Sequence, residues 1–234
     1  FFFAAAIVPL FFKEPKDAST TESHKAVEAV HPHSFWQVLS HDSSLARLAV
    51  VAASFSAAII LFPHYQAFAR EQFGNTSGSL LMWIVVQNIA TGLASLVVGP
   101  LADHRGNRLV IIGLLGSCAG TPLFVAALSM ASQSTAVQWF WLAYVPLGFN
   151  PIMLRIISNY ALELAPTVEL QPRYVSLVGV AMAIPFVLSP IVGWGIDVLG
   201  GVPFFLSGAA SIALGTLVAF GLPEPRNSHF NTQK

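Results

Sequence analysis

Six long apolar runs constrain this chain more than any other feature of its sequence. They cover roughly residues 45–69, 80–101, 109–131, 137–162, 174–196 and 202–222. Each run is about 20 residues or longer, which is the length that an α-helix needs to cross the hydrocarbon core of a bilayer. Buried helices of water-soluble proteins rarely come six in a row at this length. The runs therefore predict an all-α, polytopic membrane protein with a bundle of six transmembrane helices.

The composition agrees with a lipid environment and excludes several other classes of protein. Of the 234 residues, 55% are hydrophobic and 9% are charged, whereas an ordinary soluble domain has about 25% charged residues. The 11 Lys and Arg balance the 11 Asp and Glu, so the chain lacks the positive excess of a nucleic-acid binder. Its single cysteine, Cys118, excludes an intrachain disulfide and a cysteine-cluster metal site. The chain has no HExxH, P-loop or GxSxG motif, and we expect no enzyme, metal or cofactor.

Polar segments divide the chain into four parts. Residues 1–12, FFFAAAIVPLFF, are apolar but would span only about 18 Å as a helix. We expect them to be the end of a transmembrane helix that begins before Phe1; a re-entrant segment is the alternative. Residues 13–44 are expected to form a polar cytoplasmic linker, residues 45–222 the six-helix transmembrane domain, and residues 223–234 a cytoplasmic tail.

The distribution of cationic residues predicts the orientation in the membrane. If the six runs cross in sequence, one side of the membrane holds nine of the 11 Lys and Arg, namely Lys13, Lys16, Lys25, Arg47, Arg105, Arg108, Arg173, Arg226 and Lys234. The positive-inside rule places this side, with the linker and the C-terminus, in the cytoplasm of a cell-membrane protein. The opposite helix ends carry Trp83, Trp139, Trp141 and Trp194. Because indole rings favour the membrane interface, we expect these tryptophans to be anchors there.

The turn between the second and third runs carries the most specific motif of the chain. It reads GPLADHRGNR over residues 99–108. Gly106 supplies the flexibility of a tight turn, and Gly99 would let neighbouring helices approach closely. Asp103 is positioned to pair with an arginine of the turn or to face the positive N-terminus of a packed helix. A cationic turn with an incidental acid is the alternative interpretation.

This turn resembles the signature loop of the major facilitator superfamily, G-x-L-A-D-x-x-G-x-(R/K). The matching residues are Gly99, Leu101, Ala102, Asp103, Gly106 and Arg108, whereas His104 and Asn107 replace residues that are often basic. The resemblance implies that the six runs are helices 7 to 12 of a twelve-helix transporter, half of that fold, with an N-terminal six-helix half as the missing partner. It also implies that helices 7, 8, 10 and 11 line the transport cavity. In the family, the acid of this loop is a conformational latch that contacts the opposite half.

Polar residues inside the runs are the candidate substrate-binding residues. Arg155 is the only charged side chain well inside a run, and a charge at bilayer depth usually faces a partner or a watery cavity. We expect it to bind an anionic or polar substrate or to pair with an acid of the missing half. Snorkelling to the cytoplasmic interface is the alternative. Asn150, before Pro151, is a second candidate, but it lies about 140° around the same helix from Arg155.

Two further pairs of residues are candidates on other helices. Gln87 and Asn88 lie near the middle of the second run, although amides in lipid more often join helices than bind ligands. His64 and Tyr65 lie near the outer end of the first run, beside Pro63, where we expect a kink. His64 is a candidate for proton coupling; a histidine at a wet interface is the alternative.

The residues and the resemblance together predict a function. We expect a secondary transporter of the major facilitator superfamily, the chain being its C-terminal half, which moves a small-molecule solute across the lipid bilayer by alternating access. A non-transporting membrane receptor or scaffold that retains this fold is the alternative. The identity of the solute, proton coupling and the direction of transport are not encoded in any of these motifs.

Overall fold

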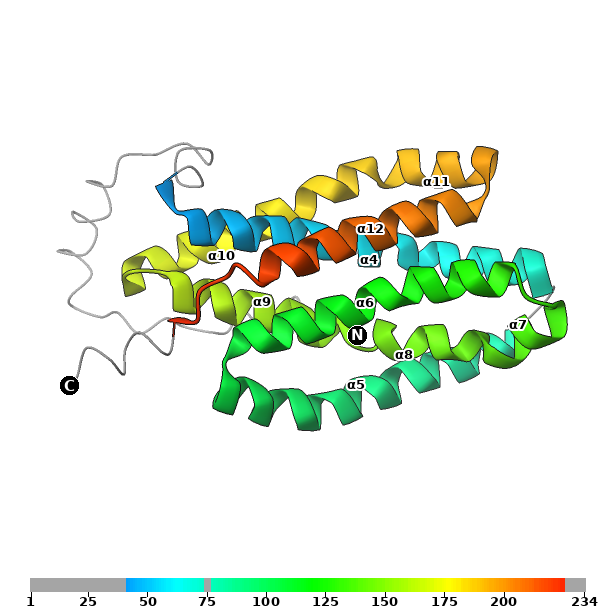
Figure 1. Cartoon of the computed structure of the whole chain (residues 1–234), viewed down its shortest axis with the longest axis horizontal. Coiled ribbons are helices and arrows are strands. Elements are labelled where there is room, and N and C mark those ends of the chain that lie inside the picture. The colour runs from blue at the N-terminus through cyan, green and yellow to red at the C-terminus, as the bar shows by residue number, and fades with distance from the viewer. Residues whose placement is uncertain (1–40, 74–76, 226–234) are drawn as a thin grey trace, which may run out of the picture. The chain divides into compact units, whose positions relative to one another are not determined.

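The computed structural model describes residues 41–73 and 77–225 (Figure 1). From Asp42 onward the described residues belong to one unit, and they form helices and turns without a strand. The predicted helix end over residues 1–12, the linker up to residue 40 and the tail after Pro225 lie outside the described residues.

Six segments of this unit are long and apolar enough to cross a membrane, which confirms the predicted number of spans. The first three are the single helices α4 (Ser43–Phe73), α5 (Ser77–Arg105) and α6 (Asn107–Ser129). The fourth is divided into α7 (Gln133–Trp139), the 3₁₀ turn η2 (Phe140–Ala143), α8 (Tyr144–Leu147) and α9 (Asn150–Leu164). The fifth is divided into η3 (Val168–Leu170), α10 (Gln171–Ala183), η4 (Ile184–Leu188) and α11 (Ser189–Leu199). The sixth is α12 (Gly201–Ala219).

The start of α4 follows from a local capping interaction. The Asp42 Oδ1 atom accepts hydrogen bonds from the backbone N–H groups of Ser44 and Leu45, at 2.9 and 3.1 Å. A carboxylate in this place satisfies N–H groups that have no partner within the helix. The hydroxyl of Tyr174 donates to Asp42 Oδ2 at 2.6 Å, so the same side chain connects α4 to α10.

Prolines divide the fourth and fifth spans, and their effect depends on position. Pro151, Pro185 and Pro190 each lie in the first turn of a new segment, in α9, η4 and α11. A proline fits there because its missing N–H has no helical partner to lose. Pro63, in contrast, lies inside α4, and the helix continues through it to Phe73. The kink expected at Pro63 therefore does not interrupt the helix.

The packing of the six segments leaves two of them at the edges of the unit. Helices α4, α6 and α12 pack against one another. In the most apolar stretch of the second and of the fifth span, 17% of the residues are buried, against 56% in the first and in the third. Figure 1 shows α5 and α11 on opposite sides of the bundle. The second and fifth spans are therefore the peripheral ones.

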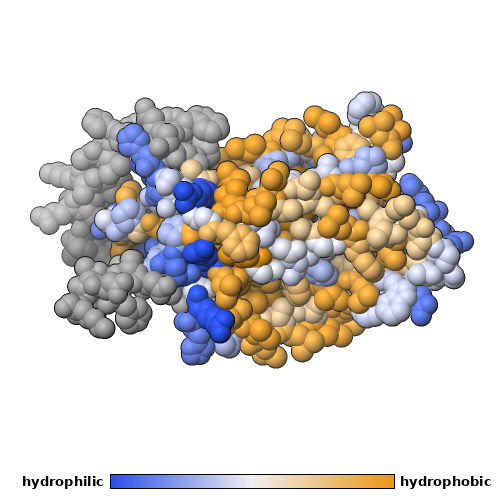
Figure 2. Space-filling model, in the orientation of Figure 1, coloured by the Kyte–Doolittle hydropathy of each residue, from blue (hydrophilic) through white to orange (hydrophobic). Residues whose placement is uncertain are grey.

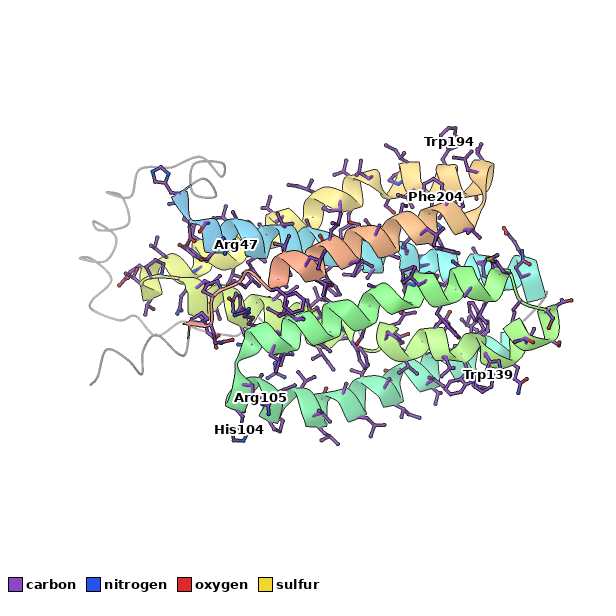
Figure 3. The ribbon with its side chains drawn as sticks, viewed as in Figure 1. Arg47, His104, Arg105, Trp139, Trp194 and Phe204 are labelled. Carbon is purple, nitrogen blue, oxygen red and sulfur yellow. The ribbon has the colours of Figure 1, made fainter. Side chains whose placement is uncertain are left out.

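The surface has the polarity of a membrane protein. Figure 2 shows apolar residues across the middle of the visible face and hydrophilic residues towards its two ends. Figure 3 places Trp139 and Trp194 at the end of the bundle opposite to His104 and Arg105. Trp139 and Trp194 are exposed, in agreement with a role at the membrane interface.

Trp83 differs from Trp139 and Trp194 because it packs inside the bundle. Its side chain is 5% exposed. Its ring lies 4.9 Å from the ring of Phe140 and is stacked on that of Tyr144 at 5.3 Å, measured between centroids. Aromatic neighbours in these geometries give a large ring more contact than an interface can. The expectation of an interfacial anchor at Trp83 is therefore corrected to a core position.

Candidate functional site

The candidate site is a cavity between α5 and α9 with a volume of about 360 Å³. Two series of residues, each at every fourth position, line it. They are Thr91, Ser95, Gly99 and Asp103 on α5, and Pro151, Arg155 and Asn159 on α9. Residues four apart lie on one face of a helix, so each series forms a stripe along its helix. Asn107 of α6 also lines this space, which we call the α5–α9 cavity.

Gly148, just before α9, positions the two stripes by a close contact with α5. The Thr91 hydroxyl donates to the carbonyl of Gly148 at 2.6 Å. A Cβ at position 148 would lie 2.5 Å from the carbonyl oxygen of Gln87 and 3.0 Å from the Ala90 Cβ. Only glycine permits this approach, and the helical rise from this contact places Arg155 about level with Gly99. Neither Thr91 nor Gly148 was a candidate from the sequence, because both look like ordinary small residues of apolar runs.

Arg155 is an exposed side chain that lines the α5–α9 cavity. Within the part of the chain that the structure describes, its guanidinium has no hydrogen-bond or ion-pair partner. Nine residues separate it from the end of α9 at Leu164, which corresponds to about 14 Å of helix. The cavity thus presents a cation well inside a span, where a charged side chain usually faces a partner or a watery cavity.

Gly99 and Asp103 of the turn over residues 99–108 line the same cavity as Arg155. Asp103 is exposed and, unlike Arg155, it interacts with another group of the protein. Apart from its chain neighbours and the backbone of its own helix, no described atom lies within 4 Å of the position that a Cβ on Gly99 would take. The expected close helix contact at Gly99 is therefore absent among the described residues, and the glycine leaves open space opposite Arg155 instead.

Gly106 and Arg108, the other half of the loop, hold the end of α12. Gly106 has φ 84° and ψ 163°, a conformation that is essentially restricted to glycine, and the Glu224 carboxyl group occupies the place of a Cβ. The Arg108 guanidinium donates to the carbonyl of Phe220 at 2.6 Å. Arg47, labelled in Figure 3, likewise donates to the carbonyl of Gly221. These cations bind the last carbonyls of α12, which carry partial negative charge.

Tyr160 of α9 completes this attachment, because its hydroxyl donates to the carbonyl of Pro223. The segment after α12 is thus attached to α4, α6 and α9, whereas the first half of the loop faces the cavity. The sequence predicted the turn at Gly106 but not its contact with Glu224.

Asn107 is a cavity residue that sequence reasoning treated only as a departure from the family pattern. Its side chain is 2% exposed, and its Nδ2 atom is buried without a hydrogen-bond partner among the described residues. A buried donor without an acceptor costs roughly 1–3 kcal/mol. Among the residues that line the cavity, Asn107 is therefore one with an unsatisfied polar atom. No signal in the sequence distinguishes it from an asparagine exposed at a turn.

Asn150, Gln87 and Asn88 lie apart from the lining of the α5–α9 cavity. Asn150 is half-buried, and its Oδ1 atom lies 3.8 Å from the Cys118 sulfur of α6, in a weak S–H···O contact. The Asn88 side chain donates to the carbonyl of Ile84 in its own helix at 2.8 Å. Gln87 is half-buried, and its backbone carbonyl accepts a second bond from Thr91 at 2.9 Å. The structure therefore brings none of these amides together with Arg155.

Tyr65 and His64 also lie away from Arg155. Tyr65 is fully buried, with its ring 5.3 Å from that of Phe205 between centroids. Its hydroxyl has no hydrogen-bond partner among the described residues. His64 is half-buried beside Gly193 of α11. Tyr65 is thus part of the aromatic core, and His64 lies at a separate contact between α4 and α11.

The fold and the site together define a class: an all-helical membrane protein with a polar cavity between two of its spans. Comparisons of the chain with protein-family models, with curated proteins and with solved structures found no match. Any statement about family and function therefore depends on the residues described above.

Proposed function

We propose that the protein is a secondary transporter of the major facilitator type and that this chain supplies its C-terminal six-helix half. It would move a small solute by alternating access in the cell membrane, with the linker and the C-terminal tail in the cytoplasm. The observation that carries this proposal is the α5–α9 cavity. Polar side chains and Arg155 line it at membrane depth, where a face in contact with lipid would be apolar.

The exposure of the spans supports a partner half. The second and fifth spans, with 17% of their apolar stretches buried, are the least buried of the six. By the resemblance these are helices 8 and 11, two of the four that line the transport cavity. Surfaces that are exposed in this chain are available for the second half.

The division of the signature loop supports a conformational role. Gly99 and Asp103 line the cavity, and Arg108, five residues after Asp103, binds the end of α12. One short turn therefore connects the cavity with the end of the last helix. A movement of α12 relative to α5 would alter both places together.

The test is uptake by liposomes that carry the complete gene product. Radiolabelled benzoate, glucose and choline represent an anionic, a neutral and a cationic solute. We expect saturable uptake of at least one of them, with Arg155→Ala and Asp103→Ala each reducing the rate at least tenfold. Arg70→Ala, which removes an exposed cation in the last turn of α4, is the control and keeps the wild-type rate.

Two results would count against the proposal. Uptake no greater than in protein-free liposomes for all three solutes contradicts transport and favours the receptor or scaffold alternative. Uptake by this chain alone, as a monomer, contradicts the two-half architecture.

A further inference from the structure

We infer that the α5–α9 cavity binds a small organic monoanion with an apolar body; the inference depends on the proposed transport function for its biological meaning. The first step is the charge of Arg155. Its guanidinium lies in the cavity without a partner among the described residues. A guanidinium offers several N–H donors in a planar arrangement that fits a carboxylate. The missing partner is therefore an anion.

The apolar part of the ligand follows from the rest of the lining. Val98, Ile152 and Ile156 contribute to the wall, and their side chains are 8%, 8% and 6% exposed. They lie on the same two helices as the polar stripes. A ligand that places a charged group on Arg155 would rest its remaining atoms on these side chains. A hydrocarbon body gains from this contact, whereas a fully hydrated inorganic anion does not.

Asn107 adds an amide donor to the wall of the cavity. Its Nδ2 atom is buried and lacks an acceptor among the described residues. Asn107 lies at the start of α6. An amide donor without an acceptor attracts an oxygen atom.

Asp103 restricts the ligand to a single negative charge. It lies on the same stripe as Gly99, about 6 Å farther along α5. A monoanion can direct its carboxylate towards Arg155 and away from Asp103. A second carboxylate at the opposite end of the ligand would approach Asp103 and be repelled. The cavity is thus expected to prefer a monoanion to a dianion, as well as an anion to a cation.

The experiment measures binding to the detergent-purified protein by calorimetry, with four ring compounds of similar size. Benzoate is the monoanion, benzamide the neutral analogue, benzylamine the cation and terephthalate the dianion. We expect benzoate to bind and the other three to bind at least tenfold more weakly. Arg155→Gln should weaken benzoate at least tenfold, Arg155→Lys should keep part of the affinity, and Asp103→Asn should admit terephthalate. Arg70→Gln is the matched control and should bind benzoate like the wild type.

Several results would overturn the inference. These are the absence of benzoate binding, equal binding of benzamide, or wild-type benzoate affinity in a folded Arg155→Gln variant. Thermal unfolding in the same detergent establishes whether each variant is folded. Binding is measured without transport, so the two proposals fail separately. If benzoate binds but no solute is taken up, the anion site stands and the transport function is contradicted. If glucose is taken up independently of Arg155 and benzoate does not bind, the transport function stands and the anion site is contradicted.

Discussion

The backbone conformation at Gly106 requires a glycine at this position. Its φ of 84° with ψ of 163° lies in a region that side-chain-bearing residues avoid, and its backbone N–H donates to the carbonyl of Ala102 at 3.0 Å. The conformation turns the chain from α5 into α6 within one residue. The turn therefore determines where both the cavity stripe and Arg108 lie.

Gly106→Ala should lower the free energy of unfolding by about 1–3 kcal/mol, because the new Cβ is strained and meets the Glu224 carboxyl group. Thermal unfolding in detergent measures the change. Gly113→Ala is the matched control, since Gly113 lies inside α6 and no described atom lies within 4 Å of its Cβ position. Equal midpoints for the two variants would contradict the role given to Gly106.

Sequence patterns predicted some residues well and others not at all. Gly106 was predictable because a turn between two apolar runs needs such a residue, and Arg155 because a charge within a run is rare. The orphan amide of Asn107 and the close contact of Gly148 depend on which helix packs beside them. The buried position of Trp83 was not predictable for the same reason, since its neighbours Phe140 and Tyr144 come from another span.

The break in the fifth span is stabilised by a residue from another helix. Pro185 has no N–H, so the carbonyl of Met182 cannot receive the bond that a 3₁₀ turn would give it. The hydroxyl of Ser56 in α4 donates to this carbonyl at 2.7 Å and also to its own Ala52 carbonyl at 3.2 Å. Ser56 is fully buried, and its hydroxyl therefore gives the Met182 carbonyl a partner from another helix.

Ser56→Ala should destabilise the protein by about 1 kcal/mol, because the Met182 carbonyl loses its partner. We also expect faster hydrogen exchange of the amides of η4, measured by mass spectrometry. Ser117→Ala is the control, since the Ser117 hydroxyl is exposed and donates to the Gly113 carbonyl of its own helix. Unchanged exchange in η4 would show that Ser56 does not support the break.

Arg47 and Arg108 should stabilise the backbone hydrogen bonds at the C-terminal end of α12. The double variant Arg47→Ala/Arg108→Ala removes both donors to the carbonyls of Phe220 and Gly221. Amide exchange over residues 219–222 should then accelerate at least fivefold, because each charged donor contributes on the order of 1 kcal/mol at an exposed site. In Arg70→Ala the exchange should stay at the wild-type rate. Wild-type protection in the double variant would mean that α12 ends independently of these cations.

At the scale of elements, the apolar runs predicted all six spans, because a bilayer requires a minimum length of apolar helix. The division of the fourth and fifth spans was not predictable from their prolines alone. Pro63 is tolerated inside α4, whereas Pro151 and Pro185 begin new segments. Which proline breaks a helix depends on whether neighbours such as Ser56 satisfy the freed backbone groups.

At the scale of the whole molecule, the two ends of the helical unit differ in chemistry. Trp139 and Trp194 lie at one end, and His104 and Arg105 lie at the other (Figure 3). By the positive-inside rule, we propose that the end with His104 and Arg105 is the cytoplasmic one.

Reporter fusions after Lys234 test this orientation in a bacterial host. A green fluorescent protein, which folds in the cytoplasm, should fluoresce there, and an alkaline phosphatase, which needs export, should stay inactive. The opposite pair of results would invert the topology and place Arg105 and Arg108 outside the cell.

The central claim is that the α5–α9 cavity is a water-accessible path at membrane depth. The most direct measurement is the labelling of single cysteines by a water-soluble maleimide in intact membranes, after Cys118→Ala removes the native thiol. Ser95→Cys and Asn159→Cys lie on the cavity stripes, and Leu96→Cys and Leu154→Cys, at exposed apolar positions outside the cavity lining, are the controls. Because maleimides react with thiolates, which form in water, the two stripe positions should be labelled and the two leucine positions should not. Equal labelling of all four positions, or of none, would contradict the account.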